Sequence, residues 1–155
     1  MATTTTTTTT TTNIPRRQRA TVLPTAVLTT GSALALNLAV FGVARARDIS
    51  FVFPQPGSDS GTQTVTAGAV AAFTVTTMII GWIIGTRAAS HHRPTLRTTA
   101  IIAAAISTVS TMLPLTVNAG LSVKLTLASL HVITGGCYIM GIAALRRSDT
   151  ERARS

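Results

Sequence analysis

The sequence predicts an all-α integral membrane protein, a bundle of four transmembrane helices that run alternately up and down. Hydrophobic residues make up 46% of the 155 residues and charged residues only 11%, a balance that a soluble domain of this size does not normally show. The apolar residues are gathered in four uncharged runs, each about as long as a bilayer crossing requires. The 13 Lys and Arg lie outside these runs, in the tails and connections, so they indicate membrane edges and no nucleic-acid partner.

The four-helix membrane domain is predicted over residues 20–145, between two polar tails. The N-terminal tail, residues 1–19, contains ten consecutive threonines and no apolar periodicity, so we expect it to be disordered in the cytoplasm. The C-terminal tail, residues 146–155, is polar and is also expected in the cytoplasm. The four predicted spans are the uncharged runs at residues 20–44, 65–86, 98–115 and 125–145.

The connection between the first two spans, residues 45–64, is expected to form a short hairpin-like loop outside the membrane. It holds the apolar stretch Phe51-Val52-Phe53, then prolines and glycines, then a Thr-rich stretch. This is the pattern of two short strands joined by a turn. We expect the surface from Phe51 to Val65, together with the arginine-rich loop before the third span, to contact a partner.

The third span is the least hydrophobic of the four. Pro114 lies close to its end, where a helix most easily accommodates the missing N–H donor. Small and hydroxyl side chains recur along one side of this span, at Ala103, Ser107 and Ser110. Because helices in lipid associate through small residues and interhelical hydrogen bonds, we interpret this span as the central helix of the bundle.

The distribution of basic residues predicts which side of the membrane each loop occupies. If both termini are cytoplasmic, ten of the 13 Lys and Arg fall inside and three outside, as the positive-inside rule requires. Twelve of the 13 basic residues are arginine, and Ala and Thr are abundant. This is the usage expected of a GC-rich bacterial genome, so we expect the bacterial cytoplasmic membrane. The competing interpretation is a signal peptide cleaved at Ala44-Arg45-Ala46, but the run exceeds the roughly 7–15 apolar residues of such signals.

Small residues predict where the spans touch. Gly81 and Gly85 form a Gly-x-x-x-Gly match in the second span, and Gly135 lies between His131 and Tyr138 on one helical stripe of the fourth. Packing within the bundle is the main interpretation, and a homodimer face is the alternative. Trp82 and Tyr138 lie toward the inner ends of their spans, so we expect them to anchor at the inner interface.

A polar intramembrane site is the main functional candidate. His131 is the one histidine within a span, and it shares a helical stripe with Tyr138. An ionisable group in a membrane indicates a proton-sensitive switch or a contact to a solute. The structural alternative is a neutral imidazole bonded to the first or third span, and the candidate polar residues on those spans are Asn37, Ser107 and Ser110.

Several classes of chemistry are disfavoured by what the sequence lacks. The chain has one cysteine, Cys137, and its four Asp and Glu lie outside the spans, which argues against thiol redox chemistry and cation/proton exchange. With His91 and His92 in a loop, haem ligation by two intramembrane histidines is also disfavoured. We therefore expect no cofactor, no metal and no enzymatic activity. Three arginines around the inner loop are expected to contact anionic headgroups, namely Arg87, Arg93 and Arg97.

Residues 16–147 resemble an uncharacterised actinobacterial family of small four-helix membrane proteins, a domain of unknown function. The resemblance rests on the Phe51-Val52-Phe53-Pro54 stretch, the segment from Ser110 to Pro114, and the segment from Leu127 to His131. It implies the four-helix fold and the cytoplasmic membrane, and it supplies no activity.

The sequence is compatible with two functions. The first is a non-enzymatic protein that acts through helix–helix contacts with a membrane-protein partner or with itself. The second is a small permease or channel-like subunit, whose polar path uses Asn37, Ser107, Ser110 and His131.

Overall fold

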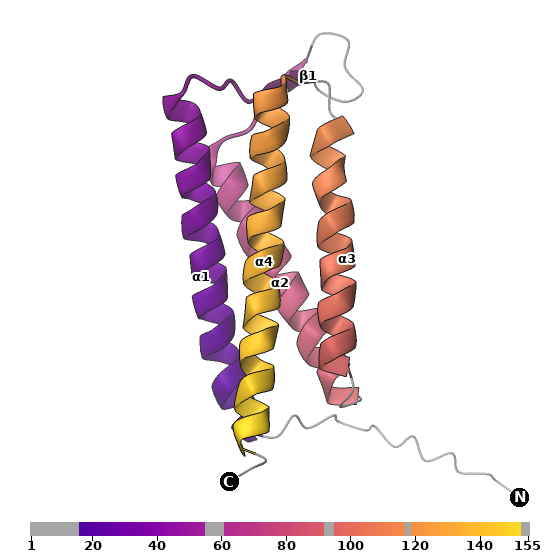
Figure 1. Ribbon diagram of the computed structural model, residues 1–155. Coiled ribbons are helices and arrows are strands. Elements are labelled where there is room, and N and C mark those ends of the chain that lie inside the picture. The colour runs from indigo at the N-terminus through magenta and orange to yellow at the C-terminus, as the bar shows by residue number, and fades with distance from the viewer. Residues whose placement is uncertain (1–15, 55–60, 92–94, 117–118, 153–155) are drawn as a thin grey trace, which may run out of the picture.

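The computed structural model describes residues 16–54, 61–91, 95–116 and 119–152 as a mostly helical chain (Figure 1). The described elements are four helices and one antiparallel pair of strands, in which Phe53 pairs with Gln63. In chain order the elements are α1 (Arg16–Ala46), β1 (Val52–Pro54), β2 (Thr62–Thr64), α2 (Ala67–His91), α3 (Thr95–Thr116) and α4 (Leu121–Arg152).

The four helices alternate in direction, so the start of α1 and the end of α4 lie at the same end of the bundle (Figure 1). The end of α2 and the start of α3 lie at that end too, and the β1–β2 pair lies at the other, called here the hairpin end. Helix α4 packs along both α1 and α3, and α1 also packs along α2. Helices α2 and α3 contact each other much less, and α2 contacts α4 least, so α2 packs loosely on the side that faces α3 and α4.

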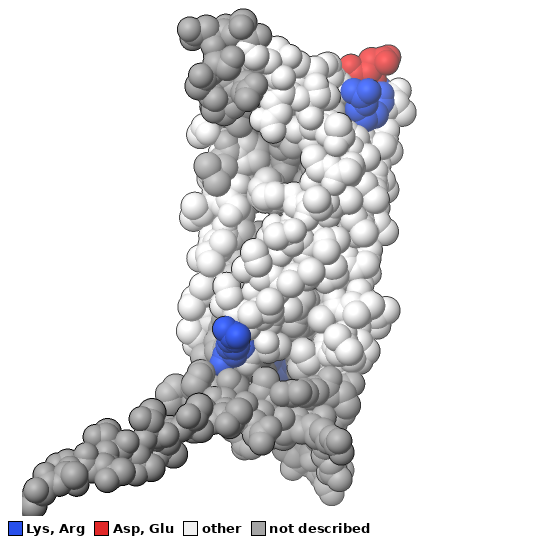
Figure 2. Space-filling model, turned by 180° about the vertical axis from the view of Figure 1, so that it is seen from behind, with Lys and Arg blue, Asp and Glu red and all other residues white. Residues whose placement is uncertain are grey.

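Three helices are long and apolar enough to cross a membrane: α1, α2 and α4. Helix α3 contributes a shorter apolar stretch, Ala100–Thr116. On the face shown in Figure 2, the described Lys, Arg and Asp side chains lie near the two ends, and the broad middle carries none. These features confirm the prediction of a mainly helical, membrane-type chain.

The helices extend beyond the uncharged runs that define the predicted spans. Helix α1 begins at Arg16 and α4 continues to Arg152, into the two predicted polar tails. Charged side chains limit how much of a helix the hydrocarbon core accepts, but arginine is a good helix former. The first 15 residues, with the threonine run, lie outside the described residues.

The prediction that the third span is the central helix is wrong, because α4 holds that position. Most described residues of α3 are exposed, and Pro114 is its only buried residue among them. Large side chains on α3 face outward, among them Ile101, Ile106 and Val109. Hydroxyl spacing suggested a protein-facing helix, but each hydroxyl can also bond within its own helix, as Thr108 does to the carbonyl of Ala104.

The hairpin end of the bundle is closed by Phe51, which is fully buried. Its ring lies against that of Phe41, with the centroids 4.9 Å apart, in a cluster that also contains Val70 of α2 and Val123 of α4. The prediction that Phe51 lies on an exposed contact surface is therefore wrong. An apolar side chain is more stable when it fills the space between the helices at the end of the bundle than when it faces solvent.

A local motif aims the chain from α1 toward this cluster. Asp48 has a φ of 56°, the left-handed conformation that often ends helices. The N–H of Asp48 donates to the carbonyl of Arg45, and the N–H of Ile49 donates to the carbonyl of Ala44. These two bonds form a Schellman motif. At the other end of the connection, the Thr66 hydroxyl caps α2 by accepting the N–H of Ala69 at 3.1 Å.

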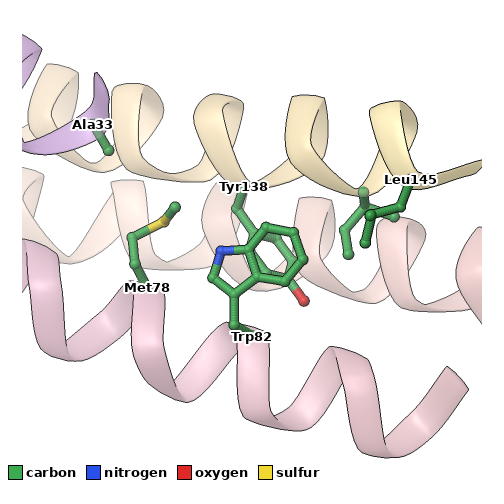
Figure 3. Packing of buried hydrophobic residues seen from close by; sticks show 6 residues of the cluster. Ala33, Met78, Trp82, Tyr138 and Leu145 are labelled. Carbon is green, nitrogen blue, oxygen red and sulfur yellow. The ribbon is translucent and has the colours of Figure 1, made fainter. Parts of the chain in front are cut away.

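A second apolar cluster fills the bundle toward its other end (Figure 3). Trp82 of α2 and Tyr138 of α4 form its centre, with ring centroids 5.5 Å apart in an edge-to-face arrangement. Their exposed fractions are only 6% and 8%, so the prediction of interfacial anchors is wrong. The small residues around them, such as Gly81 and Gly141, leave room for two large rings inside the bundle.

Candidate functional site

Asn37 is the hub of a buried polar layer. Its side-chain N–H groups donate to the hydroxyl oxygens of Thr74 and Thr134, both at 2.9 Å, and the residue is 1% exposed. Each threonine hydroxyl donates its own proton to a carbonyl of its own helix, so each accepts from the amide nitrogen of Asn37. One amide thus connects α1, α2 and α4. Thr134 had no distinguishing signal in the sequence beyond being a hydroxyl in an apolar run.

The amide oxygen of Asn37 is buried and has no hydrogen-bond partner among the described residues. The indole nitrogen of Trp82 is the other such buried atom in that part of the chain. An unpaired buried acceptor is costly and usually indicates a missing partner such as water or a ligand. The polar layer therefore has capacity for one more donor.

His131 of α4 bonds within its own helix. Its ring nitrogen Nδ1 lies 2.8 Å from the carbonyl oxygen of Leu127, and because a carbonyl only accepts, Nδ1 carries the proton. In the neutral ring, Nε2 is then an acceptor. The ring also lies against Phe73 of α2, with centroids 5.8 Å apart. The interhelical bonds to the first or third span that the sequence suggested are not formed.

Ser107 and Ser110 come from α3 and make no hydrogen bond through their side chains to any described residue. Ser107 lies directly against Gly135 of α4, where an added Cβ would be 2.7 Å from the Cβ of Ser107. Since α3 and α4 are antiparallel (Figure 1), Ser110 lies about one turn further toward the hairpin end, near the level of His131. These groups and the Asn37 hub occupy about one turn of the bundle.

A cavity of about 580 Å³ lies between α2 and α3, with α4 behind it. The face shown in Figure 2, which carries α2, is hollowed in its upper half. All five residues of the predicted polar site line this cavity: Asn37, Ser107, Ser110, His131 and Tyr138. Most of the wall is apolar, including Phe73, Met78, Ile80, Ile84, Ile102 and Ile106. Because α2 and α3 pack loosely, a mainly apolar cavity is left between them, and the residues of the candidate site line it.

The three predicted packing glycines all lie against side chains of this chain. An added Cβ at Gly81 would be 3.1 Å from the ring of Tyr138, and one at Gly85 would collide with the Tyr138 hydroxyl. That hydroxyl donates to the carbonyl of Gly81 at 2.8 Å. The Gly-x-x-x-Gly face therefore holds α2 on α4 within one chain, as Gly135 holds α4 on α3.

The basic residues expected at headgroups are only partly described. Arg87 is exposed near the end of α2, at the end of the bundle where α1 begins (Figure 1). Arg97 lies in the first turn of α3, and Arg93 lies outside the described residues. The described part of the chain contains no group of His, Cys, Asp and Glu that could hold a metal ion.

The fold is a helical bundle of the membrane-protein class, and a mainly apolar cavity with a few polar side chains in its wall lies between α2 and α3. The chain belongs to the family of unknown function DUF6069, whose family model matches residues 17–148. No curated protein and no solved structure matches the chain. The predicted membership of a family of unknown function is thereby confirmed, and the actinobacterial origin stays a prediction.

Proposed function

We propose that this is a small, non-enzymatic protein of the bacterial cytoplasmic membrane that binds a membrane-soluble molecule between α2 and α3. The observation that carries the proposal is the convergence of Asn37, Ser107, Ser110 and His131 on one cavity of about 580 Å³. Cavities of this size accept small molecules, and a few convergent polar groups in an apolar wall are what orients them. The same site serves a small permease or channel-like subunit.

In this proposal all four helices cross the membrane and both termini are cytoplasmic. The charge distribution supports it, because Arg87 and the first turn of α3 lie at the end where α1 begins, and positive-inside orientation makes that end cytoplasmic. The arginines there contact anionic lipid headgroups, at roughly 1 kcal/mol per basic residue. The β1–β2 pair then lies on the extracytoplasmic side.

The non-enzymatic assignment rests on how the polar groups are used. The Nδ1 proton of His131 bonds to its own helix, and the described residues that line the cavity include no Asp or Glu to stabilise a protonated ring. The amide N–H groups of Asn37 are held by two threonines. The arrangement is suited to holding a ligand and not to moving protons between activated groups.

The test is purification of the tagged protein in native nanodiscs, followed by the mass of the intact complex and identification of bound small molecules. Ala103 lines the cavity, so Ala103→Leu fills part of it. Ala105 is exposed and does not line it, so Ala105→Leu is the matched control. We expect a bound molecule with the wild type and with Ala105→Leu, and its loss with Ala103→Leu. Equal recovery from all three proteins would overturn the proposal.

Helix–helix contact with a membrane-protein partner or a second copy is the second candidate. It is favoured by the outer face of α1, where added Cβ atoms at Gly31 and Gly42 would meet nothing within 4 Å. Small residues on an open face let another helix approach closely. In the same mass measurement, a stoichiometric second polypeptide that is lost with Gly31→Leu and kept with Ala103→Leu would establish this function instead.

A further inference from the structure

The wall of the cavity carries hydrogen-bonding groups that the described chain leaves unused. The hydroxyls of Thr77, Ser107 and Ser110 make no hydrogen bond to any described residue, and all three line the cavity. His131 adds the acceptor Nε2, because its proton is on Nδ1. In hydrocarbon no water satisfies such groups, so a bound molecule with one small polar group complements them.

The charge of the wall restricts that polar group to a neutral one. No Lys, Arg, Asp or Glu is among the described residues that line the cavity. A carboxylate, phosphate or ammonium group near the middle of the bilayer would lack a counter-charge, which is costly. A hydroxyl group both donates and accepts, so it can donate to His131 Nε2 and accept from Ser107 or Ser110.

The shape of the cavity restricts the rest of the molecule. A helix with its side chains is about 10 Å wide, which is large for a cavity of about 580 Å³. A single hydrocarbon chain is much narrower. Exposed apolar side chains flank the opening on both helices, namely Phe73, Ile80, Ile84, Ile102 and Ile106, so the chain can enter sideways from the bilayer.

We propose that the ligand is a neutral single-chain lipid with a hydroxyl head. The hydroxyl head lies at Ser107, Ser110 and His131, and the hydrocarbon chain lies along the isoleucines of α2 and α3. This inference rests on the proposed binding function and specifies its ligand.

Trp82 provides the readout, because it is the only tryptophan of the chain and its ring packs on Tyr138, which lines the cavity. Three probes share one chain, brominated at the same mid-chain positions, and differ only in the head: stearyl alcohol, stearate and octadecane. Saturable quenching of Trp82 fluorescence in nanodiscs measures the affinity of each. We expect the alcohol to bind about tenfold more tightly than the alkane, as one or two hydrogen bonds provide, and the stearate to bind more weakly than the alcohol.

Two variants test the role of the polar wall. Ser110→Ala and His131→Leu are each expected to reduce the affinity for the alcohol toward that for the alkane. Neither should change the affinity for the alkane. Ser129→Ala is the control, since that serine bonds to its own helix and does not line the cavity. Should His131→Leu fail to fold, Ser110→Ala alone decides the question.

The outcomes separate the ligand from the binding function. If the three probes bind equally, or the stearate binds best, the hydroxyl-lipid inference is wrong while binding in the cavity stands. If none quenches saturably and no molecule is recovered from the native complex, the binding function itself is wrong.

Discussion

The amide nitrogen of Asn37 on α1 donates a hydrogen bond to the hydroxyl of Thr134 on α4, 97 residues later in the chain, at 2.9 Å. The same amide donates to Thr74 on α2. Hydrogen bonds between helices in lipid do not compete with bulk water, and they require one register of the helices that they join. The polar layer therefore sets how α1, α2 and α4 are aligned, whereas α3 takes no part in it and packs mainly on α4.

The first prediction concerns this layer. Thr134→Val removes the hydroxyl that accepts from Asn37, so we expect a loss of about 1 kcal/mol in the free energy of unfolding, the size of one interhelical bond in lipid. Thr126→Val is the control, because Thr126 lies on the same helix and its hydroxyl makes only a local bond, to the carbonyl of Ser122. Reversible unfolding in mixed micelles measures both. Equal losses would show that the Asn37 bond contributes nothing of its own.

The second prediction uses two adjacent glycines. Gly135→Ala places a methyl group against Ser107 of α3, whereas Gly136→Ala meets nothing within 4 Å. We expect Gly135→Ala to destabilise the protein by about 1–3 kcal/mol, as overpacking typically does, and Gly136→Ala to be neutral or slightly stabilising because alanine favours a helix. Adding Ser107→Gly to Gly135→Ala should restore part of the loss. Without such rescue, the α3–α4 contact would not be the cause.

The third prediction is a double-mutant cycle between α2 and α4. Gly85→Ala collides with the hydroxyl of Tyr138, and Tyr138→Phe removes that oxygen together with its bond to the Gly81 carbonyl. Each single change should lower stability. The double variant should lose less than the two losses added, by about 1 kcal/mol, because residues in contact are coupled. Additive losses would place Gly85 and Tyr138 out of contact.

The fourth prediction concerns the hairpin end. Phe51→Ala empties a fully buried site against Phe41, so we expect a loss of about 3–5 kcal/mol, as for other buried phenylalanines. Val52→Ala is the control, since Val52 is 45% exposed. If thermal unfolding gave the same loss for both variants, Phe51 would not close the bundle.

Much of the fold could be predicted from the sequence because a bilayer imposes simple rules on length and charge. Uncharged runs of sufficient length predicted the positions of the helices, and polar groups at a helical spacing predicted candidates that line one cavity. The orientation of a helix about its own axis follows from a stripe such as His131, Gly135 and Tyr138. Such a stripe depends only on the residues of one helix, so it can be recognised in the sequence.

Hydrogen bonds between residues on different helices could not be predicted in the same way. The partners of Asn37 are two of many threonines, and nothing local distinguishes Thr134 from the others. His131 was expected to bond to another helix, but the carbonyl of Leu127 lies one turn away on its own helix and is always within reach. The central position of α4 depends on which neighbours fit its glycines, which is a property of two surfaces and not of one helix.

The central claim is that a molecule of the membrane occupies the cavity between α2 and α3, and photocrosslinking in native membranes tests it most directly. A benzophenone side chain is placed at Ile106, which lines the cavity, or at Ile101, which does not; the two are 61% and 60% exposed. We predict one dominant small-molecule adduct at position 106 and a bulk phospholipid mixture at position 101. The same phospholipid mixture at both positions, or a polypeptide adduct at 106, would contradict the claim.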